Sequence, residues 1–346
     1  MESERILGQN HILRHFENAI RMGKISHAYI INGEEGSGKM NLAIHFAKAL
    51  QCERNNFNKA INEDGERITV PGTACGQCKS CKQTDSKNQP DIKYITYEKS
   101  GIGVDEIREQ INDDIDIKPY SSPYKIYIVP ESEKMTVQAQ NALLKTIEEP
   151  PEYAIIILLT TNADTFLQTI LSRCVMLNIR PVKEDIIKNQ LTSQYGVGDY
   201  EARVAATFSN GNPGKAIKLA TSEEFKELKQ YVVGMFMSLE KGGMDIIGEA
   251  IKKTGTFKKQ IDEYFSLMRI WFRDILVYKA TKEEDQIIFQ DEYMTIEKMS
   301  QTYSFDDIND ILKAIDLAES RIKSNVNFDS TIEILLLSIK EKTSAK

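Results

Sequence analysis

Short apolar runs alternate with segments of helical periodicity through the first half of the chain, and this alternation is typical of an α/β domain built on a parallel sheet. We expect buried strands where the runs are rich in Ile, Val, Leu and Tyr, at residues 27–32, 91–97, 125–129, 154–160 and 174–179. Apolar residues at helical spacing predict helices between them, at residues 41–52, 104–115 and 136–148.

After Pro181 the strand-like runs stop, and only the helical period continues. Short helices are expected over residues 182–220, interrupted by a Gly-Asn-Pro-Gly turn at 211–214. Longer apolar-periodic stretches at 261–278 and 308–322 predict further helices. Because the chain is too long for one compact core, we expect three domains: an α/β domain at 1–180, a small helical domain at 181–221 and an all-helical domain at 222–346.

Composition and charge narrow the class of protein. With 41% hydrophobic and 27% charged residues, the chain is typical of a soluble globular protein. Its longest strongly apolar stretch, Ala154–Leu159, is too short to cross a bilayer, and its first residues lack the pattern of a signal peptide. We therefore expect a cytoplasmic protein with no membrane partner. The net charge of −7 disfavours a chain that wraps nucleic acid alone, so any DNA contact is expected to be local or shared with partner subunits.

A candidate phosphate-binding loop follows the first expected strand. Gly33-Glu-Glu-Gly-Ser-Gly-Lys39 matches the pattern in which backbone N–H groups curl around phosphate oxygens and the lysine reaches the β and γ phosphates. The alternative is a tight strand-to-helix turn without a ligand, which the lysine disfavours. The candidate nucleotide-binding residues are Gly33, Gly36, Ser37, Gly38 and Lys39.

Two substitutions remove the groups that would handle magnesium at this loop. Met40 stands where a Ser or Thr hydroxyl normally binds the ion, and a thioether is a poor ligand for a hard cation. Pro130-Glu131 stands after the 125–129 strand, where an acidic pair is expected; Glu131 remains, but the aspartate is missing. We therefore expect negligible intrinsic ATP hydrolysis and no bound magnesium, while Lys39 and the glycines leave ATP or ADP binding open.

Four of the five cysteines form a candidate metal site. Cys75, Cys78 and Cys81 are separated by two residues each, and Cys52 lies upstream. Four thiolates suffice for a closed structural zinc site, and an iron–sulfur cluster would take the same number. Clustered cysteines in a cytosolic chain indicate metal rather than disulfides. We expect zinc to hold an inserted module together, and we expect Cys174 to be an ordinary strand residue.

Several motifs together resemble the bacterial DNA polymerase III clamp-loader family of AAA+ type P-loop proteins. They are Ile6-Leu-Gly-Gln9, Gly23-Lys-Ile-Ser-His-Ala28, the four-cysteine module, Asn141-Ala-Leu-Leu-Lys-Thr-Ile-Glu-Glu-Pro150 and Ser172-Arg-Cys174. The resemblance covers roughly residues 4–220, and beyond it only Arg269–Leu276 is suggestive. The linker between Cys52 and Cys75 is longer than the family's, which puts the local shape of the module in question but not its ligands. Within the family, the substitutions at Met40 and Pro130 are similar to those of the delta-prime type of subunit.

The resemblance also implies a mechanism. Family members form a hetero-pentamer of motor subunits, delta and delta-prime, which loads the sliding clamp on primed DNA, with ATP at the subunit interfaces. Arg173 would be an arginine finger presented in trans to ATP held by a neighbouring motor subunit. Thr161 and Asn162 would occupy the first sensor position, and Lys215 the second, where arginine is more usual. The small helical domain would be the lid, and the C-terminal helices the collar where subunits associate.

Three functional hypotheses stay open at this point. The first is a delta-prime-like subunit with a degenerate ATPase site and Arg173 acting in trans. The second is an ATP-hydrolysing motor subunit of the same loader, which Met40 and Pro130 disfavour. The third is a zinc-dependent nucleic-acid-binding protein on a P-loop scaffold, which the acidic net charge disfavours. Arg173 could also be a solvated arginine at the start of a strand.

Overall fold

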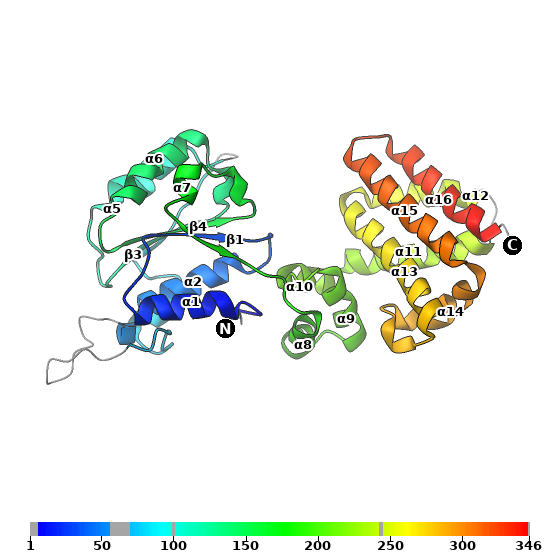
Figure 1. Cartoon of the computed structure of the whole chain (residues 1–346), viewed down its shortest axis with the longest axis horizontal. Helices are drawn as coiled ribbons and strands as arrows, with labels where there is room; N and C mark the ends of the chain where they lie inside the picture. Colours follow the sequence, from blue (N-terminus) through cyan, green and yellow to red (C-terminus); the bar gives the residue numbers. More distant parts are fainter. Residues whose placement is uncertain (1–5, 56–69, 99–100, 242–244, 345–346) are drawn as a thin grey trace. The chain divides into compact units, whose positions relative to one another are not determined.

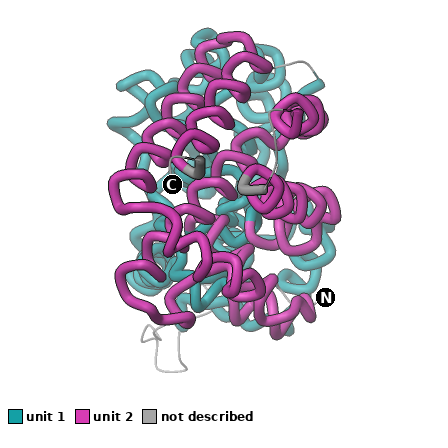
Figure 2. Tube along the Cα trace, turned by 90° about the vertical axis from the view of Figure 1, so that its right-hand side faces the viewer, with its two compact units in different colours: residues 1–187, 211–215 teal, residues 188–210, 216–346 magenta. Residues whose placement is uncertain are grey.

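A computed structural model describes residues 6–55, 70–98, 101–241 and 245–344. These residues divide into two compact units, the first comprising the chain up to residue 187 together with 211–215, and the second comprising 188–210 and the chain from 216 onward (Figure 2). Each unit is described by itself. The three-domain division at 1–180, 181–221 and 222–346 stays a prediction.

The first unit is built on a five-stranded sheet in the order β2-β3-β4-β1-β5, with every pairing parallel (Figure 1). This confirms the expected fold class, an α/β domain with a parallel sheet followed by a helical region. Each expected strand is present within a few residues of its predicted bounds: β1 (Ala28–Asn32), β2 (Ile92–Tyr94), β3 (Lys125–Val129), β4 (Ala154–Thr160) and β5 (Val175–Asn178).

Strand β2 is shorter than predicted because a glutamine side chain, and not a neighbouring strand, pairs with the backbone after it. Beyond Tyr94, the backbone N–H and carbonyl of Thr96 pair with the side-chain amide of Gln110, at 3.0 and 2.8 Å. Gln110 lies in a π-helical stretch, η2 (Arg108–Asn112), between α4 (Val104–Ile107) and α5 (Asp113–Ile115). The helix predicted at 104–115 is therefore present, with one widened turn.

Helices cover both faces of the sheet, and alternate strand residues fill the two resulting cores. On one face, α1 (Asn10–Arg21) and α2 (Lys39–Leu50) bring Phe16 and Phe46 into a stack with centroids 4.0 Å apart. The opposite face is covered by α4 and α5, together with α6 (Val137–Glu148) and α7 (Gln168–Leu171) (Figure 1). Burying one such aromatic side chain contributes about 2 kcal/mol to the stability of the fold. The two cores therefore hold the sheet together, and with it the strand ends that carry the candidate site.

The remaining short elements of this unit are η1 (Glu53–Asn55), α3 (Lys79–Asp85), η3 (Ser132–Lys134) and η4 (Ala163–Thr165). Thr136 caps α6, because its side chain accepts a hydrogen bond from the N–H of Ala139. The helix ends before Pro150-Pro151, as the prolines require.

The helices of the second unit pack around aromatic side chains of its longest helix, α13 (Ile261–Thr281). Trp271 and Phe272 are completely buried, and Phe236 packs against both rings. No helix in the described ranges is long and apolar enough to span a membrane. The other helices are α8 (Glu184–Tyr195) and α10 (Pro213–Thr221), which both start in the first unit, α9 (Asp199–Phe208), α11 (Glu223–Lys241), α12 (Asp245–Thr256), α14 (Tyr293–Thr302), α15 (Phe305–Lys323) and α16 (Phe328–Ser344).

Candidate functional site

The phosphate loop connects β1 to α2 at the carboxyl end of the sheet, as predicted. Gly36 and Gly38 have φ of +79° and +93°, a conformation that side chains resist. A Cβ at Gly33 would lie 2.9 Å from the Cβ of Ile179, the residue after β5. The glycines are therefore required by the backbone path of the loop itself, whether or not a phosphate binds.

The side chain of Lys39 forms hydrogen bonds with carbonyl groups of its own loop. Its ammonium donates to the backbone oxygens of Gly33 and Glu34 at 2.6 and 2.8 Å. Burial lowers the pKa of Lys39, while the nearby carboxylates of Glu133, Glu35 and Glu34 act in the opposite direction. The lysine that would meet a phosphate therefore lies among three acidic side chains.

The Gly-Asn-Pro-Gly turn packs directly against the tip of the phosphate loop. The Asn212 side chain donates to the carbonyl of Glu35 at 2.7 Å, and the N–H of Gly214 donates to the carbonyl of Gly36 at 3.1 Å. A Cβ at Gly214 would lie only 2.4 Å from that Gly36 oxygen. The turn brings Lys215 beside the loop through its backbone, whose N–H donates to the Asn212 side chain.

Met40, which replaces a magnesium ligand, and Glu131, the acid that remains beside Pro130, are both turned to other contacts. Met40 packs against the apolar cluster beneath α2. Glu131, after Pro130, has a φ of +46°, and its exposed carboxylate contacts the Tyr97 hydroxyl and the Lys134 ammonium. Lys134 and then Tyr97 lower the pKa of Glu131 by stabilising its charge.

Glu133, which we did not single out from the sequence, is the acidic residue tied to the first sensor position. Its carboxylate accepts hydrogen bonds from the hydroxyl and the N–H of Thr161, at 2.7 and 3.3 Å. Burial raises the pKa of Glu133, but the hydrogen bonds from Thr161, Thr160 and its own backbone N–H together outweigh burial, and the net shift is downward. The Asn162 side chain instead caps η4 by accepting from the N–H of Asp164 at 2.9 Å.

Arg173 lies at the other end of the sheet. Because β1 and β5 are parallel and Tyr29 pairs with Val175, Arg173 is level with His27, which precedes β1. The six residue steps from His27 to Gly33 span roughly 20 Å in extended conformation. Arg173 therefore cannot reach a phosphate bound at its own loop.

The guanidinium of Arg173 is held by three contacts on the surface. It donates to the Thr169 carbonyl at 3.0 Å and the Ser172 hydroxyl at 3.2 Å, and it forms a 3.0 Å ion pair with Glu148. The side chains of Arg173 and Glu148 are 41% and 44% exposed. Cys174, beside it, takes no part, and burial raises the pKa of its thiol to about 12.

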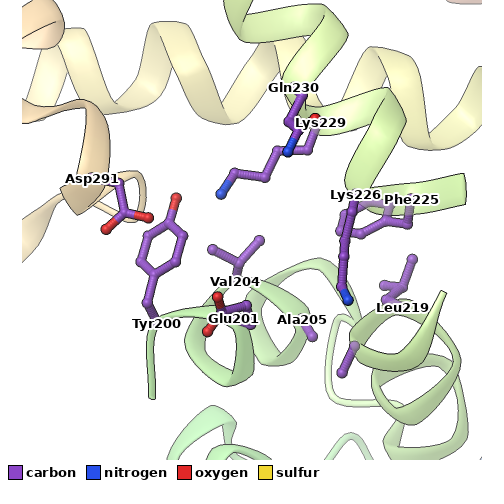
Figure 3. Close-up of a pocket in the computed structure, with 11 residues that line it drawn as sticks. Tyr200, Glu201, Val204, Ala205, Leu219, Phe225, Lys226, Lys229, Gln230 and Asp291 are labelled. Carbon is purple, nitrogen blue, oxygen red and sulfur yellow. The ribbon is translucent and has the colours of Figure 1, made fainter. Parts of the chain in front are cut away.

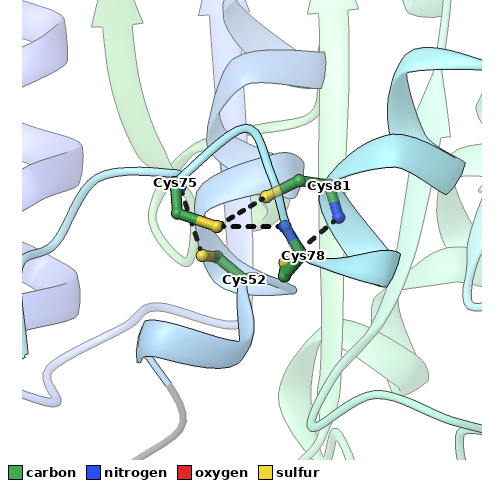
Figure 4. Close-up of side chains that lie close together, drawn as sticks. All are labelled: Cys52, Cys75, Cys78 and Cys81. Carbon is green, nitrogen blue, oxygen red and sulfur yellow. Dashed lines mark hydrogen bonds between the residues drawn. The ribbon is translucent and has the colours of Figure 1, made fainter.

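The four predicted cysteines converge (Figure 4). The sulfur atoms of Cys52, Cys75, Cys78 and Cys81 all lie within 4.8 Å of one another, and those of Cys75 and Cys81 are 3.9 Å apart. Tetrahedral zinc with Zn–S bonds of about 2.3 Å needs sulfurs roughly 3.8 Å apart. A multi-iron cluster places its own atoms between the thiolates and would hold them further apart, so this donor set fits a single ion.

Backbone N–H groups point at these sulfurs, as thiolate ligands require. The Cys78 and Cys75 N–H groups donate to the sulfurs of Cys75 and Cys52, both at 3.3 Å, and the Cys81 N–H donates to the sulfur of Cys78 at 3.4 Å. N–H donation from Cys78 and then Gln77 lowers the pKa of Cys75 to about 6. These four residues could hold a metal ion.

Asn55 pins the returning segment of the cysteine module, a role that no local sequence signal indicates. Its buried side chain donates to the Ala49 and Thr73 carbonyls and accepts from the Gly72 N–H, at 2.8, 3.1 and 3.0 Å. Gly72 has a φ of +79°, and a Cβ there would lie 2.6 Å from the Glu17 carbonyl. Most of the long linker, residues 56–69, lies outside the described ranges.

A pocket of about 230 Å³ lies within the second unit, among α9, α10, α11 and the η7 turn (Gln290–Glu292) (Figure 3). Lys229 places its ammonium 4.1 Å above the ring of Tyr200, whose hydroxyl has no hydrogen-bond partner among the residues that the structure describes. None of the predicted site residues lines this pocket.

Comparison with known proteins identifies the family of the chain. The profile of the family described as "DNA polymerase III, delta subunit" matches residues 8–183, and that of "DNA polymerase III, delta subunit, C terminal" matches residues 248–341. DNA polymerase III subunit delta' of Bacillus subtilis is 26% identical over 96% of both chains. The tau subunit of the same organism is 34% identical over 62% of this chain, which spans only 36% of tau.

A solved structure of a DNA polymerase III gamma-subunit-related protein from Thermotoga maritima covers 96% of this chain and 99% of its own, with a TM-score of 0.41 and 20% identity. The first of the family profiles extends over half of the chain, from α1 to the end of the sheet. The chain therefore belongs to the DNA polymerase III, delta subunit, family, the clamp-loader family that its motifs resemble.

Proposed function

We propose that this chain is a delta-prime-like subunit of a bacterial clamp loader, which does not hydrolyse ATP itself but completes the ATPase site of a neighbouring motor subunit. In this proposal it works in the cytoplasm within a hetero-pentamer of motor subunits and delta, and helps to load the sliding clamp on primed DNA. Arg173 is the finger, and its position carries the proposal: it lies at the sheet end opposite its own phosphate loop, yet is exposed.

Arginine suits this role because its planar fork is always charged and matches phosphate oxygens. A finger supplied in trans accelerates hydrolysis by about 10³–10⁵-fold in phosphoryl-transfer enzymes. A residue that cannot reach nucleotide in cis can do so only across a subunit interface, and the resemblance places ATP at those interfaces.

The proposed lack of intrinsic hydrolysis is supported at both magnesium positions. The Met40 thioether packs into the apolar cluster, and Pro130 offers no ligand. Glu131, the remaining acid, is paired with Tyr97 and Lys134. Binding of ATP or ADP without magnesium at Gly33, Gly36, Ser37, Gly38 and Lys39, with Thr161, Asn162 and Lys215 nearby, is part of the proposal only as an open possibility.

We further propose that Cys52, Cys75, Cys78 and Cys81 hold structural zinc. The sulfur spacing favours one tetrahedral ion over a multi-iron cluster. With four thiolates the coordination is closed, so the ion would supply folding energy to the module and no open position for chemistry.

An ATP-hydrolysing motor subunit is the second candidate. It is favoured by one observation, the 34% identity to tau over 62% of this chain, against 26% to delta' over nearly the whole chain. The two candidates differ in the behaviour of the purified chain. Magnesium-dependent turnover by this chain alone, abolished by Lys39→Ala, would identify a motor.

The decisive experiment uses the reconstituted assembly with motor subunits, clamp and primed DNA. We expect Arg173→Ala to assemble normally but to lower stimulated ATP hydrolysis and clamp loading. Arg173→Lys should be nearly as impaired, because lysine keeps the charge but not the fork. If Arg173→Ala matches the parent in both assays, Arg173 is structural and the proposed mechanism is wrong.

A further inference from the structure

We infer that Glu148 is a positioning residue for Arg173, holding the guanidinium in the orientation from which it meets the phosphates of a neighbouring subunit. The inference rests on the proposed function of Arg173 and extends it to a second side chain. It starts from the 3.0 Å ion pair between Glu148 Oε1 and Arg173 Nη2.

The contacts divide the guanidinium into a held part and a free part. Nη1 donates to the Thr169 carbonyl and the Ser172 hydroxyl, and Nη2 forms the ion pair with Glu148. A guanidinium has five N–H donors. Nη1 is engaged by its two acceptors and one side of Nη2 by the Glu148 carboxylate, which together fix the plane of the group. The Nε–H and the other side of Nη2 have no further partner among the described residues, so they stay available to an incoming phosphate oxygen.

Glu148 is placed against the local preference of its helix. It is the last residue of α6, at the end where the helix dipole is negative and acidic side chains are disfavoured. Arg173 follows the C-terminal end of α7, where a cation is favoured. The ion pair offsets the unfavourable position of Glu148, and it links two helix ends that the chain otherwise joins only through β4.

The ion pair between Glu148 and Arg173 contributes little to the stability of the fold. Both side chains are almost half exposed, and ion pairs between exposed side chains contribute little to stability because solvent screens them. An arginine side chain, however, loses much rotational freedom when it is ordered at an interface. A side chain already ordered by Glu148 has lost that freedom before the neighbouring subunit binds.

The test compares variants of this chain in the assembly with motor subunits, clamp and primed DNA. We expect Glu148→Ala to lower the kcat of stimulated ATP hydrolysis about threefold to tenfold with KM unchanged, since Arg173 acts in the transition state. Glu148→Gln, which keeps an acceptor but not the charge, should lie between Glu148→Ala and the parent. Glu149→Gln is the matched control, because it removes the same charge one residue away and should match the parent.

Arg173→Ala and the double variant Glu148→Ala/Arg173→Ala separate the possible failures. If Glu148 acts through Arg173, adding Glu148→Ala to Arg173→Ala changes nothing further. A loss with Arg173→Ala but none with Glu148→Ala would overturn this inference and leave the proposed function intact. An equal extra loss in the Arg173→Ala background, or faster hydrolysis with Glu148→Ala, would also overturn it. No loss with Arg173→Ala would refute the proposed function itself.

Discussion

The carboxylate of Glu133 accepts hydrogen bonds from both the hydroxyl and the backbone N–H of Thr161. This contact ties the turn after β3 to the end of β4, beside the phosphate loop. It also fixes a negative charge within electrostatic reach of Lys39. A nucleotide phosphate at this loop would therefore meet an acidic side chain where magnesium-dependent sites provide a cation.

We predict that Glu133→Gln increases the affinity of the purified chain for ADP. The glutamine can still accept from Thr161, while the charge that opposes phosphate is removed, and a gain of about 1.4 kcal/mol would be tenfold. Isothermal titration calorimetry without magnesium measures the change. Glu131→Gln is the matched control, because Glu131 is not among the carboxylates that act on Lys39 and its loss should leave ADP binding unaltered. Equal affinity for parent and Glu133→Gln contradicts the electrostatic argument.

The cysteine module should depend on bound zinc. We predict that protein purified without chelator holds one equivalent of zinc, and that Cys75→Ser lowers both the zinc content and the melting temperature. Zinc at a hundred times its Kd stabilises a folded protein by about 2.7 kcal/mol. Cys174→Ser, at a cysteine outside the cluster, should retain the metal. Less than half an equivalent in the parent, measured by atomic emission, argues against a zinc module.

The path of the chain into the module can be tested at Gly72. We predict that Gly72→Ala destabilises the protein more than Gly76→Ala in urea unfolding. Both positions have a positive φ, which costs a side chain roughly 1–2 kcal/mol. Only at Gly72 does the new methyl group also meet a backbone oxygen, that of Glu17 at 2.6 Å, whereas at Gly76 nothing lies within 4 Å. Equal losses would show that the segment moves away from α1 without cost.

Asp274 provides a pH-dependent prediction in the second unit. Its fully buried carboxylate accepts from the N–H groups of Ile288 and Phe289, both at 2.8 Å, and from Arg273. Burial raises the pKa of Asp274 above its ordinary 3.8 despite these contacts. Between the unfolded and folded pKa values the folded state binds more protons, so the free energy of unfolding rises as the pH falls.

Asp274→Asn cannot titrate and supplies the reference. We predict that the parent gains stability relative to this variant when the pH is lowered from 7 towards 4, as measured by urea unfolding at each pH. A constant difference between the two proteins would mean that the carboxyl group has its ordinary pKa. A difference that changes in the opposite direction would mean that the pKa is lowered, and that the hydrogen bonds outweigh burial.

The sequence predicts the strands and the phosphate loop well because each is encoded by neighbouring residues, the strands by short apolar runs and the loop by the spacing of its glycines and lysine. The predicted strand at 154–160 has the bounds of β4 itself, and the cysteine spacing identifies its four partners. Glu133 escaped prediction because its role depends on a backbone turn. The position of Glu131 directly after β3 made it the expected acidic residue of the site. The left-handed conformation at Glu131 directs its side chain to Lys134, and Glu133 faces Thr161 instead.

Contacts between residues that are distant in sequence could not be predicted from local patterns either. Nothing in the composition around Asn55 indicates that it would bond to segments on both sides of the linker. Arg173 was found by its motif, but its ion pair with Glu148 depends on the packing of α6 beside α7. Only the parallel register of β1 and β5 shows that this arginine lies far from its own phosphate loop.

The contact between Gly214 and Gly36 joins two backbones with no side chain between them. Such a backbone contact cannot adjust by a change of side-chain rotamer while the main chain stays still. Any rotation of the Gly36 peptide must therefore either break the hydrogen bond from Gly214 or carry the first turn of α10 with it. As long as this hydrogen bond holds, Gly36 and Gly214, distant in sequence, move together.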